Sequence, residues 1–219
     1  ITPYESVMDA DGFWNREAKT EIDVPSCVQY YGYDYFQYTN MRYPFPFNPP
    51  QIPLKNPAYH YSRYFDWVKT ENKAYIVFEG VDSCFYLYLN GREVGYSNIS
   101  HRISEFDVTP YLVDGHNKID VLVLKWNAGS YLEDQDKWRF TGIYRDIYML
   151  IRPQEHITDY KITTDIKDKD GIVSFKNNSE ITVAVEFQND TKQVAKHETV
   201  VFTVKDAKFW SAETPYLYD

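Results

Sequence analysis

The 219-residue chain has few cysteines, no long apolar run and no cluster of basic residues, and each shortage excludes a class of protein. Cys27 and Cys84 lie outside any metal-ligand spacing, and a chain of this size does not need a disulfide. We therefore expect two buried free thiols and a reducing compartment. The longest apolar stretches are about five residues, far short of the roughly 20 that span a bilayer as a helix, so the chain is expected to be soluble.

The net charge of −9 and the pI near 5.1 predict repulsion from nucleic acid and from anionic membranes. The chain opens on Ile-Thr-Pro-Tyr, without a charged segment followed by an apolar one, so no signal peptide is expected. This favours a cytoplasmic location, or a periplasmic one if a signal has been removed. The five histidines are scattered and do not form a zinc motif, and no nucleophile or phosphate-loop motif occurs. The chain therefore lacks a self-sufficient catalytic apparatus.

Tyrosine is abundant but unevenly placed, which indicates two domains. Eighteen of the 21 tyrosines precede residue 153, and the remainder of the chain is rich in Lys, Asp, Thr and Val. Arg152-Pro153 stands at this change, where proline favours extended backbone in the residue before it. We predict one domain over residues 1–153 and a second over residues 154–219.

The hydrophobic pattern repeats every two residues, which is typical of β-strands. Between strand-like runs, Asn90-Gly91 indicates a type I′ hairpin turn. Many short strands without a long helix predict an all-β fold, namely a jelly-roll (galactose-binding-like) sandwich followed by a small immunoglobulin-like sandwich. The strands expected in the first domain are 58–67, 74–79, 85–89, 105–108, 118–126 and 143–151. Those expected in the second are 157–166, 180–187 and 198–204.

Residues 42–57 contain six prolines and can donate few backbone hydrogen bonds. We expect this segment, the proline arm, to be a stiff extended stretch lying over a surface.

The densest group of chemically active side chains lies in residues 131–146. Three carboxylates (Glu133, Asp134 and Asp136) stand beside Trp138. Fixed acceptors next to an aromatic plane suit a polyhydroxylated ligand, and carboxylates also suit a hard cation. A solvated acidic turn is the alternative interpretation. An acid–base pair for glycoside hydrolysis is disfavoured, because retaining enzymes need about 5 to 5.5 Å between the two groups and neighbouring strand positions are too close.

An extended backbone here would divide these side chains between two faces. Asp134 and Asp136 would share one side, and Glu133 and Gln135 the other. One pair could then tie the loop down, through Arg139 or Arg145, while the other faces a ligand.

Several ordered motifs between residues 21 and 152 resemble one known family. They are Val24-Pro-Ser-Cys27, Gly32-Tyr-Asp34, Gln37-Tyr-Thr-Asn40, Arg42-Tyr-Pro-Phe-Pro-Phe47, Asn56-Pro, Phe78-Glu-Gly-Val-Asp-Ser83, Leu89-Asn-Gly91, Ser104-Glu-Phe-Asp107 and Gly129-Ser-Tyr-Leu-Glu-Asp-Gln-Asp136. They resemble the amino-terminal part of the large bacterial β-galactosidases of glycoside hydrolase family 2. Farther on, Phe209-Trp-Ser-Ala-Glu-Thr-Pro-Tyr-Leu-Tyr218 is similar to a segment late in that family's immunoglobulin-like domain.

The resemblance implies a modular enzyme that cleaves terminal β-galactosides with retention. It has a jelly-roll sugar-binding domain, an immunoglobulin-like domain, a TIM barrel with two catalytic glutamates, and further β domains. The present chain is then an amino-terminal fragment that is inactive alone, with the remaining domains and a β-galactoside as partners and a homo-oligomeric parent. No residue of the chain is assigned a catalytic role.

The resemblance also implies the binding residues. Asn40 matches an asparagine that hydrogen-bonds galactosyl hydroxyls, and Asp136 matches an aspartate that binds both galactose and a monovalent cation, usually sodium. The other sodium ligands and the magnesium site lie outside the chain, so neither ion is expected to bind it tightly. With Asp136 facing the ligand, we expect Glu133 and Asp134 to hold the loop in place.

The sequence departs from the family at three places. Residues 10–21 are too short for the strand that usually precedes Val-Pro-Ser, and Val28 stands where the family commonly has Trp. The second domain is expected to be cut off before its closing strands, leaving an unpaired edge. A free-standing carbohydrate-binding module, a related β-glucuronidase or β-mannosidase fragment, and a purely structural domain remain as alternative interpretations.

Overall fold

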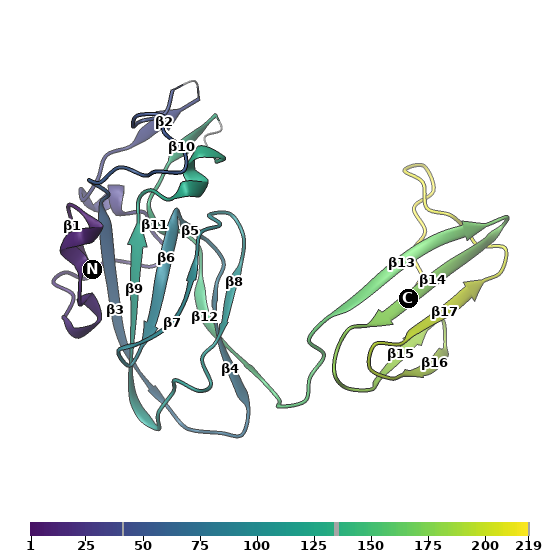
Figure 1. Cartoon of the computed structure of the whole chain (residues 1–219). Helices are drawn as coiled ribbons and strands as arrows, with labels where there is room; N and C mark the ends of the chain where they lie inside the picture. Colours follow the sequence, from purple (N-terminus) through teal and green to yellow (C-terminus); the bar gives the residue numbers. More distant parts are fainter. Residues whose placement is uncertain (41, 134–135, 219) are drawn as a thin grey trace. The chain divides into compact units, whose positions relative to one another are not determined.

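The computed structural model describes residues 1–40, 42–133 and 136–218, which form two compact units, Ile1–Ile151 and Arg152–Asp219 (Figure 1). The described helical segments are short 3-10 turns, and the rest of the regular structure is strand. Within the described residues, no helix is long and apolar enough to cross a membrane. The all-β class is confirmed, with a jelly-roll-type sandwich and an immunoglobulin-like domain.

Two sheets form the sandwich of the first unit. The five-stranded sheet has the order β1-β3-β9-β6-β7, and the three-stranded sheet has the order β12-β4-β8. The strands of the first are β1 (Thr2–Tyr4), β3 (Ala58–Trp67), β9 (Gly115–Leu124), β6 (Cys84–Leu89) and β7 (Arg92–Ser97). Those of the second are β12 (Ile147–Arg152), β4 (Lys73–Phe78) and β8 (Ser104–Asp107).

Alternation along the long central strands places the core between the two sheets. β3 and β9 pair antiparallel from Ala58↔Leu124 to Trp67↔Gly115. Tyr59 and Val123 are partners in this register and share one face of the sheet. Both are buried in the same core cluster as Phe78 of β4. Burying such side chains contributes roughly 1.5 to 3 kcal/mol each.

The other face of the five-stranded sheet is covered by the amino-terminal segment. The 3-10 turns η1 (Val7–Ala10) and η2 (Phe13–Asn15) pack on it, and Ala10 and Phe13 are buried against Leu122. As predicted, residues 10–21 contain no strand. Beside this segment, an open cavity of about 850 Å³ lies between Val121 of β9 and Ile147 of β12.

Most predicted strands of the first unit are confirmed. Strand 58–67 matches β3 residue for residue, and Asn90 and Gly91 both have positive φ, at 54° and 74°, as a type I′ turn requires. The predicted strand 143–151 is wrong as one strand, because residues 144–146 leave the sheet and divide it into β11 (Gly142–Ile143) and β12. The two-residue strand β5 (Val81–Asp82), which pairs with β11, was not predicted, nor was the pair β2 and β10 described below. Strands of two or three residues are too short to show a period.

The proline arm is irregular, as predicted, and it lies on aromatic side chains of the sandwich. The rings of Tyr43 and Phe47 contact Tyr131, with centroids 5.3 and 5.6 Å apart. The Tyr131 hydroxyl donates to the carbonyl of Gln51 (2.6 Å) and accepts from the amide of Asn48 (3.2 Å). Tyr131 belongs to η4 (Ala128–Tyr131), so the arm is fastened directly to the start of the acidic loop.

The second unit has five strands in the described chain. β13 (Tyr160–Lys167), β14 (Asp170–Asn177) and β17 (Thr199–Val204) form one sheet, and β15 (Val183–Phe187) pairs with β16 (Asp190–Val194). β14 and β16 were not predicted: β14 has only the short, mostly apolar stretch Ile172–Phe175 between polar ends, and β16 reads Asp-Thr-Lys-Gln-Val with a single apolar residue.

Candidate functional site

The two residues that the sequence assigns to ligand binding lie next to the ends of two paired strands. β2 (Gln37–Thr39) and β10 (Lys137–Arg139) pair antiparallel, with Lys137 opposite Thr39 (Figure 1). Asn40 directly follows β2, and Asp136 directly precedes β10. The two residues therefore flank the same end of the ladder, although 96 positions separate them along the chain. Both are exposed to solvent.

An aromatic pair occupies the neighbouring register position. Tyr38 and Trp138 lie opposite each other, with ring centroids 5.5 Å apart, and they are 51% and 53% exposed. Residues two apart in an extended chain share a face, so a ladder extended by one position would put Asn40 and Asp136 on the face of these rings. An amide, a carboxylate and an aromatic pair thus belong to one short, exposed region of the chain. The arrangement can bind a sugar ring, through acceptors for its hydroxyls and a plane for its C–H face.

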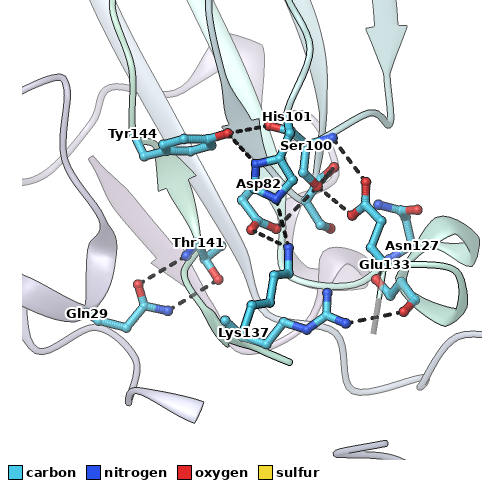
Figure 2. A network of polar contacts seen from close by, with 12 residues as sticks. Gln29, Asp82, Ser100, His101, Asn127, Glu133, Lys137, Thr141 and Tyr144 are labelled. Atoms are coloured by element: carbon cyan, nitrogen blue, oxygen red, sulfur yellow. Dashed lines mark hydrogen bonds and ion pairs between the residues drawn. The ribbon is translucent and has the colours of Figure 1, made fainter. Parts of the chain in front are cut away.

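Glu133, unlike the exposed Asp136, forms hydrogen bonds within the protein. Figure 2 shows its carboxylate turned toward Ser100, whose hydroxyl donates to Oε2 at 2.7 Å and whose amide donates to Oε1 at 3.3 Å. Ser100 is fully buried. The prediction that Glu133 holds the loop is confirmed, but its partner is Ser100, whereas Arg139 or Arg145 was expected. Asp134 and Gln135 lie outside the described residues.

Lys137 fixes the ladder from its other side (Figure 2). Its ammonium lies 3.7 Å from Asp82 Oδ2 and 3.0 Å from His101 Nε2. Tyr144 donates its single hydroxyl proton to the carbonyl of Ser100 at 2.7 Å, so His101 Nδ1 must be the donor in its 2.9 Å contact with Tyr144. Nε2 is then the acceptor for Lys137. The Ser100 hydroxyl oxygen also lies 3.5 Å from Asp82 Oδ1, so these contacts form a ring of polar groups that returns to Ser100.

Burial dominates the electrostatics of this ring. It raises the pKa of Asp82 above its usual value, and the neighbouring Lys137 ammonium opposes that shift. The carboxylate of Glu133 adds to the rise. Within the described chain, no cluster of three or more His, Cys, Asp or Glu side chains is close enough to hold a metal ion.

The β2 side of the ladder is also anchored by buried polar contacts. Gln29 exchanges hydrogen bonds with Thr141, at 3.1 and 3.3 Å (Figure 2). Its amide also reaches Asp34, which pairs with Lys125 at 2.7 Å with both side chains nearly buried. The Gly32-Tyr-Asp34 motif therefore supports the backbone that leads into β2.

Two protein-family models match this chain, one over each of its two units. Residues 4–153 match the sugar binding domain of glycosyl hydrolases family 2, and residues 155–219 match a second description of glycosyl hydrolases family 2. The chain belongs to glycosyl hydrolase family 2.

Relatives within family 2 agree over nearly the whole chain. It is 41% identical to a β-galactosidase of Staphylococcus xylosus, over 93% of this chain and 22% of that protein. It is 44% identical to a β-galactosidase of Yersinia enterocolitica, over 86% of this chain and 19% of that protein. The chain thus spans about a fifth of the length of these curated relatives.

A solved structure shares the fold. A β-glucuronidase from an uncultured Clostridium superposes with a TM-score of 0.61, covering 95% of this chain and 38% of that one. The identity is 20%, so this likeness concerns the fold alone.

The sequence did not predict several residues that support the β2–β10 ladder. Asp82, His101 and Tyr144 come from separate segments and carry no motif that links them. Only the folded chain brings them together around Ser100, Tyr144 and Lys137. Two signals were available, because Asp82 stands within the Phe78–Ser83 motif and Tyr144 within residues 131–146.

Proposed function

We propose that this chain is the amino-terminal, non-catalytic part of a β-galactosidase that hydrolyses terminal non-reducing β-D-galactosides with retention. Its task is to present Asn40 and Asp136 to the galactose in an active site completed by the rest of the protein. We infer from the family resemblance that both catalytic glutamates belong to a barrel domain. The remaining domains of the same enzyme are then the chain's partners, and the complete enzyme is expected to be a homo-oligomer.

The pairing of β2 with β10 is the observation that supports this proposal. Asn40 and Asp136 flank one end of this ladder, next to the exposed Tyr38–Trp138 pair. An amide offers a donor and an acceptor, whereas a carboxylate offers strong acceptors, and together they suit adjacent hydroxyls of a sugar.

The monovalent cation of the family fits this end of the ladder only in part. Asp136 supplies a hard oxygen donor of the right chemistry. A cation needs several such ligands, and the described residues form no cluster of them. We propose that Asp136 would be one ligand of a sodium ion whose other ligands come from elsewhere in the protein. Magnesium is assigned no residue here.

Replacing Asp136 by Asn in the complete protein tests the proposal. A hydrogen bond to a charged group contributes roughly 1.5 to 3 kcal/mol, so we expect kcat/KM for a nitrophenyl β-galactoside to fall by about 10- to 100-fold. Asp168→Asn is the matched control, because Asp168 is an exposed aspartate in a turn of the second unit. Unchanged kinetics for Asp136→Asn would overturn the proposal and favour a structural domain.

A free-standing carbohydrate-binding module is the second candidate, and the exposure of Tyr38 and Trp138 favours it. Calorimetry of the 219-residue chain with galactose separates the two. A module binds galactose measurably and loses the binding in Trp138→Ala, whereas a half-site gives no measurable heat that depends on Trp138.

A further inference from the structure

A second concave surface lies on the outer face of the five-stranded sheet, away from the β2–β10 ladder. It is a groove of about 480 Å³ between the amino-terminal segment and strands β6 and β7. This volume falls within the roughly 300 to 1,000 Å³ typical of small-molecule sites. We call it the aromatic groove; the residues on which its chemistry depends are Asp11, Phe13, Trp14, Tyr86, Tyr88 and Glu93.

One side of the aromatic groove is a rigid stack of rings. Trp14 lies parallel to Tyr88, with centroids 4.7 Å apart and an interplanar angle of 8°. The buried ring of Phe13 meets Tyr88 edge-on at 5.1 Å. The backbone carbonyl of Trp14 accepts a hydrogen bond from Lys118 Nζ at 3.3 Å. The stack is therefore held in place before any ligand arrives, which lowers the entropic cost of binding.

Polar groups stand at the edge of the aromatic groove. Glu93 is exposed and accepts a hydrogen bond from the Tyr88 hydroxyl through Oε2 at 3.1 Å. Asp11 is exposed on the opposite, amino-terminal side. None of the described residues that line the groove is Lys, Arg or His. Two carboxylates without a lining cation disfavour an anionic ligand and provide acceptors for hydroxyl groups.

We propose that the aromatic groove is a second carbohydrate-binding site, which takes a neutral pyranose unit of an oligosaccharide. The C–H face of the sugar packs on the Trp14–Tyr88 stack, and its hydroxyls donate to Glu93 and Asp11. The acidic edge selects a neutral hexose over a uronic acid. A quaternary ammonium would instead need rings set as separate walls around a small cage, which the parallel stack does not form. The groove requires neither Asn40 nor Asp136, so it is independent of the function proposed above.

Nitrogen-15 spectra of the tryptophan indoles in the 219-residue chain test this, because each of the five tryptophans reports its own surroundings. Titration with lactose should shift the Trp14 signal saturably and leave that of Trp210, exposed in the second unit, unchanged. Glu93→Gln should weaken the binding by about tenfold, and so should Trp14→Ala measured by calorimetry. Trp210→Ala is the matched control and should bind as the unchanged chain does. Trp14→Phe keeps an aromatic face and should restore part of the affinity.

Three results would overturn the aromatic groove as a sugar site. The first is a Trp14 signal that does not move with lactose. The second is a shift confined to Trp138 and abolished by Asp136→Asn, which would put all binding at the ladder. The third is saturation by choline chloride but not by lactose, which would identify a cation cage. Failure of the ladder proposal leaves the Trp14 shift intact, so the two outcomes are distinguishable.

Discussion

At the scale of single residues, burial separates carboxylates that are equivalent in the sequence. Glu133 and Asp136 stand three positions apart, yet one accepts two hydrogen bonds from the buried Ser100 and the other is open to solvent. A carboxylate that is already bonded inside the protein has few acceptor sites left for a ligand. Asp136 is therefore the better candidate for contact with sugar, and Glu133 the tether of its loop.

The two cysteines give a prediction at the same scale. Both are free, and burial raises the pKa of each thiol from 9.0 to about 11. At pH 8 the native thiolate fraction is then roughly 100-fold below that of the unfolded chain. We expect iodoacetamide to modify Cys84, which is 2% exposed, at least about 100-fold more slowly in the native chain than in urea. The single variants Cys27→Ser and Cys84→Ser assign the rates, and equal native and unfolded rates would contradict the prediction.

The raised pKa of the two thiols also determines how the free energy of unfolding changes with pH. Between about pH 9 and pH 11 the folded chain keeps the two thiol protons that the unfolded chain has lost. The free energy of unfolding contributed by these groups therefore falls as the pH rises through that window. The urea midpoint of the double variant Cys27→Ser/Cys84→Ser should decline less steeply there.

At the scale of elements, short strands do more to build the site than long ones. β2 and β10 have three residues each, and their pairing depends on support from outside the ladder. The proline arm follows β2 in the chain. It is held by Tyr131, whose hydroxyl forms hydrogen bonds with both Gln51 and Asn48. An irregular segment with few hydrogen bonds of its own relies on such contacts for its position.

Tyr131→Phe should therefore loosen the proline arm. Losing hydrogen bonds worth about 1 kcal/mol each should raise the rate of chymotrypsin cleavage after Phe47 by roughly 5- to 30-fold, while the urea midpoint changes little. Tyr30→Phe serves as the control, because Tyr30 is 71% exposed. Equal cleavage rates in the two variants would show that the Tyr131 hydroxyl does not hold the arm.

At the scale of the whole molecule, the chain spans about a fifth of its curated relatives, and its described residues are all-β. We predict that the purified 219-residue chain does not hydrolyse a nitrophenyl β-galactoside, because the described part contains no barrel to carry an acid–base pair. A complete β-galactosidase of family 2 is the positive control. Turnover by the pure chain that persists in Asp136→Asn would place catalysis in a part of this chain to which no role has been assigned.

The sequence alone determined the fold class, the long strands of the first unit, the Asn90-Gly91 turn and the position of the proline arm over a surface. Each of these follows from the local sequence. Alternation every two residues predicts strands, Asn-Gly suits a turn with positive φ, and prolines lack the amide proton that pairing in a sheet requires. The order of the motifs was also sufficient to indicate the family. Tertiary structure decided which distant residues meet. The pairing of β2 with β10 brings the chain next to Asn40 and the chain next to Asp136 to the same end of one ladder, and the fold joins Ser100 to Glu133. Such long-range pairing leaves no periodic trace in the sequence.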